Sequence, residues 1–428
     1  MAISMRGIGG GRGLRVGAAA LTLVVSAGAA LAMDDFWTLQ FGPTGGGNSA
    51  VSERQALREI ERNPEPGLPT LSPANVKATR DAIQRYTEIV QAGGWPTLPD
   101  EQVKPGEQSF AVVMLRDRLA MTGELAAGGS RSDVLDSALV EALKAYQSTN
   151  GLTPNGRLDR VTIAALNVSA EDRLKQLKTN LSRLSTLTQT TKSHRRYVVV
   201  NIPSAQVEAI ALNRVISRHT AVVGMKDRPT PILRSNIYEM NFNPIWRLPP
   251  TVIREDLIPQ ARAAQEKGED LLVKTGINAY DGNGRKIDPA KIDWSSAAPR
   301  SYSYRQPAGK DNPLGFVKIN FANSESVYMH DSPTDGLFGQ NIRAASSGCI
   351  RVHNIERLAY WLLGQNDGWD QARVEKMKET GERADVRLAS QVPLHFVYIT
   401  AWATEDGTIH FRRDLYNRDG VAEIATSY

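Results

Sequence analysis

Cysteine is almost absent from this chain, since Cys349 is the only one among 428 residues. A single cysteine excludes an internal disulfide. The six histidines are scattered and lack ligand spacing with carboxylates, so the sequence predicts no metal site. A lone thiol in a soluble protein is commonly a buried, inert side chain. The alternative for Cys349 is a nucleophile, and its sequence neighbours must decide between the two.

An excess of charge of one sign is also lacking. The chain has 51 Lys and Arg residues against 46 Asp and Glu residues. Residues 1–32 hold three of the arginines and no acidic residue, which leaves 48 against 46, about +2, in the remainder. This near balance excludes the basic signature of a nucleic-acid-binding protein. A hydrophobic content of 41% and a charged content of 23% are typical of a soluble globular protein, and the length predicts two or three domains.

Long apolar runs are missing except near the N-terminus. The run from Ala18 to Gly28 is short for a membrane span, follows three arginines and precedes the small-residue sequence Ala30-Leu31-Ala32. This order is typical of a secretory signal, so we expect residues 1–32 to be a signal peptide cleaved after Ala32. An uncleaved membrane anchor is the alternative.

Cys349 lies in the segment Ser346-Ser347-Gly348-Cys349-Ile350-Arg351-Val352, and His330 precedes it on the same stretch. A thiol attacks carbonyl carbon as the thiolate, and an imidazole within hydrogen-bond reach is the usual base. Gly348 leaves room for a substrate backbone and lets successive N–H groups converge on a developing oxyanion. Cys349 lies in a turn and not on an apolar periodic face, but the residues alone leave the nucleophile and the inert thiol both open.

The sequence from Val327 to His330 predicts a β-strand, on which Tyr328 and His330 share one face and Met329 takes the other. The tyrosine hydroxyl could then fix the ring or the tautomer of the imidazole. Asp331 would point to the opposite face, so we assign it no catalytic role. A backbone carbonyl could orient the imidazole instead, and the sequence leaves this question open.

These residues and their order resemble the L,D-transpeptidase catalytic domain of bacterial cell-wall enzymes, in its larger, periplasmic branch. By position, the resemblance implies Cys349 as the nucleophile and His330 as the general base. Tyr328 matches a tyrosine of that branch, and Arg351 matches the family's basic position after the cysteine. The chain departs from many members at Ser347, where they have a second histidine.

The resemblance also implies the remaining site residues. The backbone of Ser347, Gly348 and Cys349 would form the oxyanion hole, and Ser346, Trp246 and Arg351 would bind substrate. No metal and no cofactor are implied. The implied partners are peptidoglycan stem peptides, outer-membrane proteins as further acceptors, and carbapenem-type inhibitors. The implied location is the periplasm.

The resemblance implies acyl transfer. Cys349 would attack a peptide carbonyl of diaminopimelate in a tetrapeptide stem, release D-Ala, and pass the acyl group to an amine of a second stem. Two other interpretations remain open. One is an L,D-carboxypeptidase or crosslink-cutting hydrolase that uses the same Cys and His, and the other is a non-catalytic peptidoglycan-binding protein.

The N-terminal half contains a second resemblance. The order Ala142-Leu143, Tyr146-Gln147, Gly151-Leu152, Asn155-Gly156 and Thr162 to Asn167 resembles the small three-helix peptidoglycan-binding domain. A structural spacer without ligand is the alternative. The predicted division is a flexible arm at 33–70, a helical segment at 71–106, the peptidoglycan-binding-like domain at 107–168, a connector helix at 169–195 and the catalytic domain at 196–428.

An insertion at 246–305 interrupts the strand pattern of the catalytic domain. Val252 to Lys267 has helical spacing, and Asp281 to Trp294 is rich in turns. In the larger branch such an insertion is a cap over the active site, whereas the alternative is an exposed loop elaboration. Near the C-terminus, Phe396 to Trp402 and Thr408 to Phe411 predict a hairpin. The expected fold class is therefore α+β and multidomain, with a mainly β catalytic domain.

Overall fold

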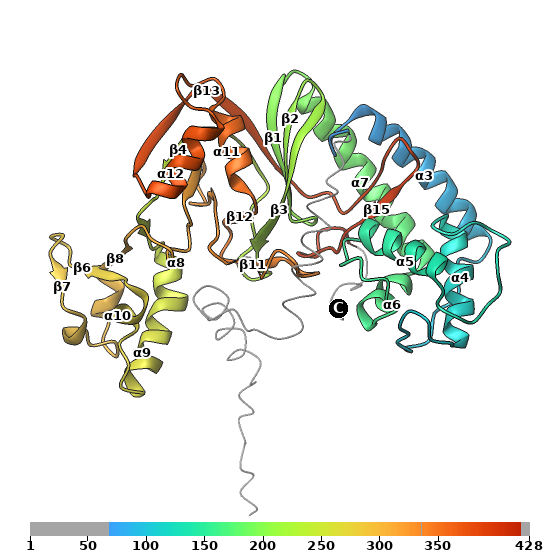
Figure 1. Ribbon diagram of the computed structural model, residues 1–428, viewed down its shortest axis with the longest axis horizontal. Helices are drawn as coiled ribbons and strands as arrows, with labels where there is room; N and C mark the ends of the chain where they lie inside the picture. Colours follow the sequence, from blue (N-terminus) through green and yellow to red (C-terminus); the bar gives the residue numbers. More distant parts are fainter. Residues whose placement is uncertain (1–67, 335, 421–428) are drawn as a thin grey trace, which may run out of the picture.

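The computed structural model describes residues 68–334 and 336–420. The predicted signal peptide at 1–32 and nearly all of the predicted arm at 33–70 lie outside these residues. The described chain forms an arch (Figure 1), with a β-sheet at its centre, helices α3 to α7 on one side and the insertion on the other. The fold class is α+β, as the sequence predicted. Within the described residues, no helix has both the length and the apolarity of a membrane span.

Two long helices, α3 (Pro73–Gln91) and α7 (Ala170–Thr191), pack side by side. Each begins at a serine that caps the first turn, since the Ser72 hydroxyl accepts from the N–H of Asn75 and the Ser169 hydroxyl accepts from that of Asp172. Leu174, Leu177 and Leu184 form the buried stripe of α7. Between these two helices in the sequence lies a compact three-helix unit, made of α4 (Phe110–Thr122), α5 (Ser137–Thr149) and α6 (Arg160–Leu166).

A nine-stranded sheet forms the predicted catalytic domain, in the order β11-β3-β12-β10-β9-β4-β13-β1-β2. Strand β3 pairs with both β12 and β2, so the sheet closes on itself. Helices α11 (Ile355–Leu363) and α12 (Gln371–Thr380) place apolar side chains in its core. The strands are β1 (Arg196–Asn201), β2 (Gln206–Ala211), β3 (Arg214–Gly224), β4 (Leu233–Phe242), β9 (Val317–Phe321), β10 (Met329–His330), β11 (Ala344–Ser346), β12 (Ile350–Val352) and β13 (Ala384–Val397).

The insertion, called the cap below (residues 246–305), has a buried core of its own that includes Trp246, Leu257, Trp294 and Tyr304. An exposed loop elaboration would lack such a core. The expected helix is present as α8 (Pro250–Val252), the π-helical turn η1 (Ile253–Leu257) and α9 (Ile258–Glu266). The sequence did not predict its four-stranded sheet, in the order β5-β8-β6-β7. The other cap elements are α10 (Leu271–Thr275), β5 (Trp246–Arg247), β6 (Asn278–Tyr280), β7 (Lys286–Ile287), β8 (Ser303–Gln306), η2 (Pro289–Lys291) and η3 (Ala298–Ser301).

The C-terminal hairpin is shorter than the sequence predicted. It consists of β14 (Ala401–Ala403) and β15 (Ile409–Phe411), whereas Phe396 and Val397 belong to β13 of the large sheet. The apolar sequence continues without a break from β13 into β14. The boundary between these strands is set by their different pairing partners, β4 and β15. Thr400 lies between β13 and β14 and donates its N–H to the Asn180 side chain of α7. Ala403 donates its N–H to Thr79 of α3, so this segment fastens the long helices to the sheet.

Candidate active site

Strands β10 and β12 are parallel neighbours that carry the candidate catalytic side chains. Met329 pairs with Ile350, and both are fully buried in the core of the sheet. His330 pairs with Arg351. Because side chains alternate along a strand, His330 and Arg351 lie on the opposite face of the sheet from this core. Tyr328 and Cys349 precede the two strands and extend the same face.

The His330 imidazole is held by a backbone carbonyl. Its Nδ1 lies 2.6 Å from the carbonyl oxygen of Asp331. Since a carbonyl only accepts hydrogen bonds, Nδ1 carries the proton, and Nε2 of the neutral ring has the lone pair. The Asp331 carboxylate faces elsewhere and accepts from the N–H of Phe316 at 3.0 Å. The orienting group that the sequence left open is therefore a main-chain oxygen.

The electrostatics of the site favour an uncharged resting pair. Burial, assisted by the positive charge of Arg351, lowers the pKa of His330 to about 3, so the imidazole is neutral near pH 7. Burial also raises the pKa of the Cys349 thiol, against the lowering influence of Tyr328, Lys318 and Arg351. The sequence argument expected the imidazole to generate a thiolate. The structure instead favours a neutral thiol and a neutral imidazole, so proton transfer must accompany attack.

Tyr328 contacts most of the other site residues. Its hydroxyl forms hydrogen bonds with the Cys349 thiol and with Trp246, and burial raises its pKa well above the ordinary value. Its ring centroid is 5.6 Å from that of His330. Trp246, expected to bind substrate, is buried in the cap core and contacts Tyr328 from behind. Trp246 therefore positions the tyrosine.

Lys318 is a site residue that the sequence argument missed. It lies on β9 directly opposite His330, and its ammonium is 4.4 Å from the centroid of the Tyr328 ring. Burial lowers the pKa of this lysine, and the charge of Cys349 opposes that shift. The available signal was the alternation in Val317-Lys318-Ile319-Asn320-Phe321, which places polar residues on one face of the strand that leads toward His330.

The turn before Cys349 is held by its own side chains. The Ser346 hydroxyl accepts from the N–H of Gly348 at 3.2 Å and donates to the carbonyl of Cys349 at 2.5 Å. Gly348 has φ +109°, a conformation that side chains disfavour. Ser346 thus maintains the turn and is buried, where the sequence argument expected it to bind substrate. The N–H of Gly348 is occupied, so of the three expected oxyanion donors Ser347 and Cys349 are left, and no hydrogen bond among the described residues engages their N–H groups.

A loop at 225–231 joins the turn to the cap. The Thr230 hydroxyl donates to the carbonyl of Gly348 at 2.9 Å. Arg228 donates both to the Ser347 hydroxyl at 3.0 Å and to Asp256 of the cap at 2.7 Å. These contacts could not be expected from the sequence, because the partners of the loop are distant along the chain.

A cavity of about 190 Å³ opens beside the site. Its walls include Tyr328 and Lys318 from the sheet face and Trp246 and Arg247 from the start of the cap. Arg351 is buried, its charge acts on both Cys349 and His330, and burial lowers its pKa to about 10. Within the described residues, no group of three or more His, Cys, Asp or Glu side chains could hold a metal ion. The site therefore gathers a thiol, an imidazole and two cations next to a cavity that Tyr328 and Lys318 line, a set of groups suited to covalent acyl chemistry.

Comparison with known proteins matches two segments of this chain to known families. Residues 195–385 match the family model of the L,D-transpeptidase catalytic domain, and residues 109–166 match that of the "Putative peptidoglycan binding domain". A Haemophilus influenzae protein named "Putative L,D-transpeptidase" is 34% identical over 229 residues, which are 53% of this chain. The alignment spans 45% of that relative's length.

Solved structures include an L,D-transpeptidase from Stackebrandtia nassauensis, with 13% identity, a TM-score of 0.26, and coverage of 73% of this chain and 99% of that one. For an L,D-transpeptidase from Xylanimonas cellulosilytica the identity is 13%, the TM-score 0.24 and the coverage 71% and 100%. The family models and the relative make the same assignment. Residues 195–385 are therefore similar to the L,D-transpeptidase catalytic domain, and residues 109–166, on their N-terminal side, are similar to the peptidoglycan-binding domain.

Proposed function

We propose that this protein crosslinks peptidoglycan by acyl transfer through Cys349. The observation that carries the proposal is the gathering of the chain's only thiol, a neutral imidazole with Nδ1 on a carbonyl, and two cations on one face of the sheet. The predicted signal sequence supports export to the periplasm as part of the same proposal. The domain at 109–166 would hold the enzyme on its polymeric substrate.

In the first half-reaction the Cys349 thiol gives its proton to Nε2 of His330 as Sγ forms a bond to the diaminopimelate carbonyl carbon. The N–H groups of Ser347 and Cys349 are available to the oxyanion that develops. Collapse breaks the C–N bond to D-Ala, whose nitrogen receives the proton from His330. The product is a thioester, and the imidazole is neutral again.

In the second half-reaction an acceptor amine gives a proton to His330 as it attacks the thioester carbonyl. The C–S bond breaks, and the sulfur recovers the proton. When the acceptor is an amine of a second stem, the result is a link between two diaminopimelates. An amine of an outer-membrane protein satisfies the same chemistry.

Lys318, Arg351 and Tyr328 support the negative sulfur during these steps. All three favour the charged form of Cys349, two through their positive charge and Tyr328 through hydrogen bonds. They offset the cost of burying a thiolate at the moment it forms. Placing them before the reaction removes the need for solvent to reorganise during it.

The test is mass analysis of the products that the purified protein makes from a disaccharide-tetrapeptide. Crosslinked dimer and free D-Ala are expected from the wild type, and neither from Cys349→Ala. A carbapenem should add its mass to the wild type and not to the variant. Tripeptide without dimer, at any acceptor concentration, would indicate the carboxypeptidase instead. A product yield from Cys349→Ala equal to that of the wild type would refute the nucleophile.

A further inference from the structure

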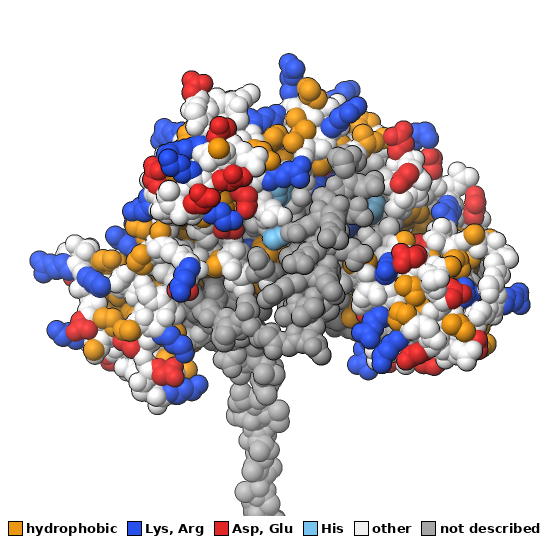
Figure 2. All heavy atoms as spheres, in the orientation of Figure 1, with side chains coloured by type: hydrophobic (Ala, Val, Ile, Leu, Met, Phe, Trp, Pro, Cys, Tyr) orange, Lys and Arg blue, Asp and Glu red, His pale blue; other side chains and the backbone are white. Residues whose placement is uncertain are grey.

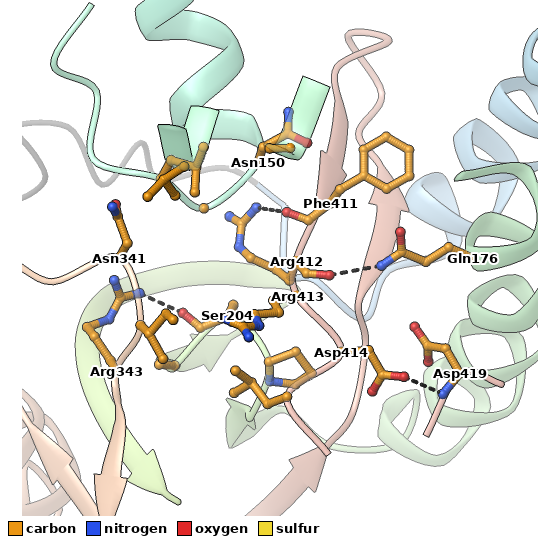
Figure 3. Close-up of a pocket in the computed structure, with 18 of the residues that line it drawn as sticks. Asn150, Gln176, Ser204, Asn341, Arg343, Phe411, Arg412, Arg413, Asp414 and Asp419 are labelled. Atoms are coloured by element: carbon orange, nitrogen blue, oxygen red, sulfur yellow. Dashed lines mark hydrogen bonds between the residues drawn. The ribbon is translucent and has the colours of Figure 1, made fainter. Parts of the chain in front are cut away.

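A groove separates the peptidoglycan-binding-family domain from the catalytic sheet, away from Cys349. Its volume is about 460 Å³, and its floor joins a smaller cavity of about 90 Å³ through shared wall residues. Figure 3 shows that smaller cavity, with Arg343 and Arg412 on its wall. Both arginines also line the larger groove. Residues from both domains therefore line both cavities, which share several wall residues.

The two arginines make incomplete use of their donors. Arg343 donates to the carbonyls of Gln340 and Ser204 at 3.0 and 2.8 Å, and its buried Nε has no hydrogen-bond partner. Arg412 donates through Nη1 alone, to the carbonyls of Thr149 and Phe411 at 2.6 and 2.7 Å. Burial lowers the pKa of Arg343 to about 10 and, together with the charge of Arg343, that of Arg412 to about 9. Both side chains are partly exposed, and their partners are neutral carbonyls and, for Arg412, the Trp402 ring at 5.1 Å, so each cation could still accept an anionic partner.

Acidic side chains do not neutralise this cluster. Among the described residues, neither arginine has a carboxylate within ion-pair distance, and neither does Arg357 on the groove rim. Glu141 lines the groove but pairs with Lys144 at 3.0 Å. Asp414 and Asp419 line the smaller cavity and are engaged by Tyr398 and Arg183. Elsewhere on the face in Figure 2, acidic and basic side chains are interspersed. The groove is therefore a local concentration of uncompensated positive charge.

The groove lies where the two domains contact each other. One of its wall residues, Arg343, is close in sequence to the turn that precedes Cys349. Thr153 of the N-terminal domain donates its N–H to the Asn341 side chain at 2.6 Å. A side chain at Gly151 would come within 2.7 Å of Arg412, so the two domains approach closely here. Arg343 directly precedes β11. Six peptide units separate it from Cys349, a chain length of at most about 20 Å.

We propose that this groove binds a carboxylate of a peptidoglycan stem peptide, as a second substrate site between the two domains. The planar guanidinium groups of Arg343 and Arg412, with free donors in a common hollow, are suited to a carboxylate. One wall comes from a domain of the peptidoglycan-binding family and the other from the catalytic domain, which favours the polymer that both would contact. The inference rests on the proposed function for the identity of the ligand.

The experiment measures binding of a disaccharide-tetrapeptide to the full chain carrying Cys349→Ala, by calorimetry, so that no turnover occurs. Adding Arg343→Gln and Arg412→Gln should weaken binding at least tenfold. The matched control is Arg214→Gln, an exposed arginine on the same sheet, which should leave binding unchanged. Arg343→Lys with Arg412→Lys keeps the charge but loses the planar guanidinium groups, so it should weaken binding less than the Gln pair does; equal loss in both pairs would point to misfolding.

A second experiment compares different ligands on the full chain that carries only Cys349→Ala. A tetrapeptide with amidated carboxyl groups and the disaccharide without peptide should both bind at least tenfold more weakly than the intact compound. Equal affinity for the amidated and intact peptides overturns the proposal, as does binding of inorganic phosphate in preference to both. Thioester formation by the wild type with a carbapenem is measured in parallel. If it occurs while the arginine variants bind normally, the groove assignment has failed and the proposed function has not.

Discussion

The Arg228 guanidinium joins the catalytic turn to the cap, because its Nη1 donates to Asp256 at 2.7 Å and to the Ser347 hydroxyl at 3.0 Å. The Asp256 side chain is 3% exposed and lies in the π-helical turn η1. The position of the cap is therefore coupled through Arg228 to the position of Ser347. This contact gives the cap a route to the oxyanion donors.

Asp256→Asn should weaken this junction. The change leaves Arg228 with a neutral partner and should lower the free energy of unfolding by about 1–3 kcal/mol. Turnover of a disaccharide-tetrapeptide should fall by more than tenfold, while alkylation of Cys349 by iodoacetamide stays close to wild type. Glu255→Gln, at the exposed neighbouring position, is the control. Unchanged turnover in Asp256→Asn would show that the cap does not act through this ion pair.

Lys318→Met should slow acylation. Removing the ammonium takes away one of the charges that favour the Cys349 thiolate, so the rate of thioester formation should fall roughly 10- to 100-fold, or about 1.4–2.7 kcal/mol. Stopped-flow measurement with a carbapenem gives this rate. Lys310→Met, at an exposed position, is the matched control. Equal rates for the two variants would remove Lys318 from the site.

The sequence predicted the parts of the site that depend on local order. Alternation along one strand was enough to place Tyr328 and His330 opposite Met329, and the turn residues around Gly348 identified Cys349 as the exceptional thiol. Lys318 and Arg228 were missed because their roles depend on strand register and on a loop contact between distant segments. Ser346 was misread because a hydroxyl beside a nucleophile looks the same in sequence whether it faces substrate or the backbone.

The same limit applies to the fold. Helix α3 was predictable because Ser72 and Pro73 mark its first turn. The small sheet of the cap was not, since β5 and β7 have two residues each and are defined by pairing alone. Similarly, Phe396 belongs to β13 because it pairs with Leu233, which no local signal shows.

His330→Ala should separate the two possible resting states of Cys349. Because burial raises the pKa of the thiol and the imidazole is neutral, iodoacetamide alkylation of the wild type should rise with pH past about 8.5, the ordinary value for cysteine. The variant should give a similar alkylation profile but should lose acylation by a carbapenem near pH 7, where a general base is needed. A wild-type plateau of fast alkylation below pH 7, absent in the variant, would mean that a thiolate–imidazolium pair exists at rest.

Acid should destabilise the fold through its buried histidines. Burial lowers the pKa of His219 and His395 to about 4 and that of His330 to about 3, against 6.5 when unfolded. The unfolded chain then binds more protons, so stability is complete above pH 6.5 and falls as the pH drops toward 4, by up to about 1.4 kcal/mol per histidine per pH unit. Asp331, whose pKa burial raises to about 6, contributes with the opposite sign.

Urea unfolding at a series of pH values between 4.5 and 7.5 measures this slope. His219→Gln removes one titrating group and should flatten the slope, whereas the exposed change Arg214→Gln should not. If His219→Gln has the same slope as wild type, this histidine takes up a proton equally in the folded and unfolded states.

Ser346→Ala tests whether this serine binds substrate or maintains the turn. The hydroxyl bonds to the N–H of Gly348 and the carbonyl of Cys349, and the residue is only 3% exposed. Its loss should cost about 1 kcal/mol of stability and release the turn that directs the N–H groups of Ser347 and Cys349. Steady-state kinetics with a disaccharide-tetrapeptide should then show kcat reduced at least tenfold with KM within twofold of wild type, because the affected interaction is made with the transition state. Ser347→Ala, which loses only the contact with Arg228, should have a smaller effect on kcat. A raised KM with unchanged kcat in Ser346→Ala would instead assign the hydroxyl to ground-state substrate binding.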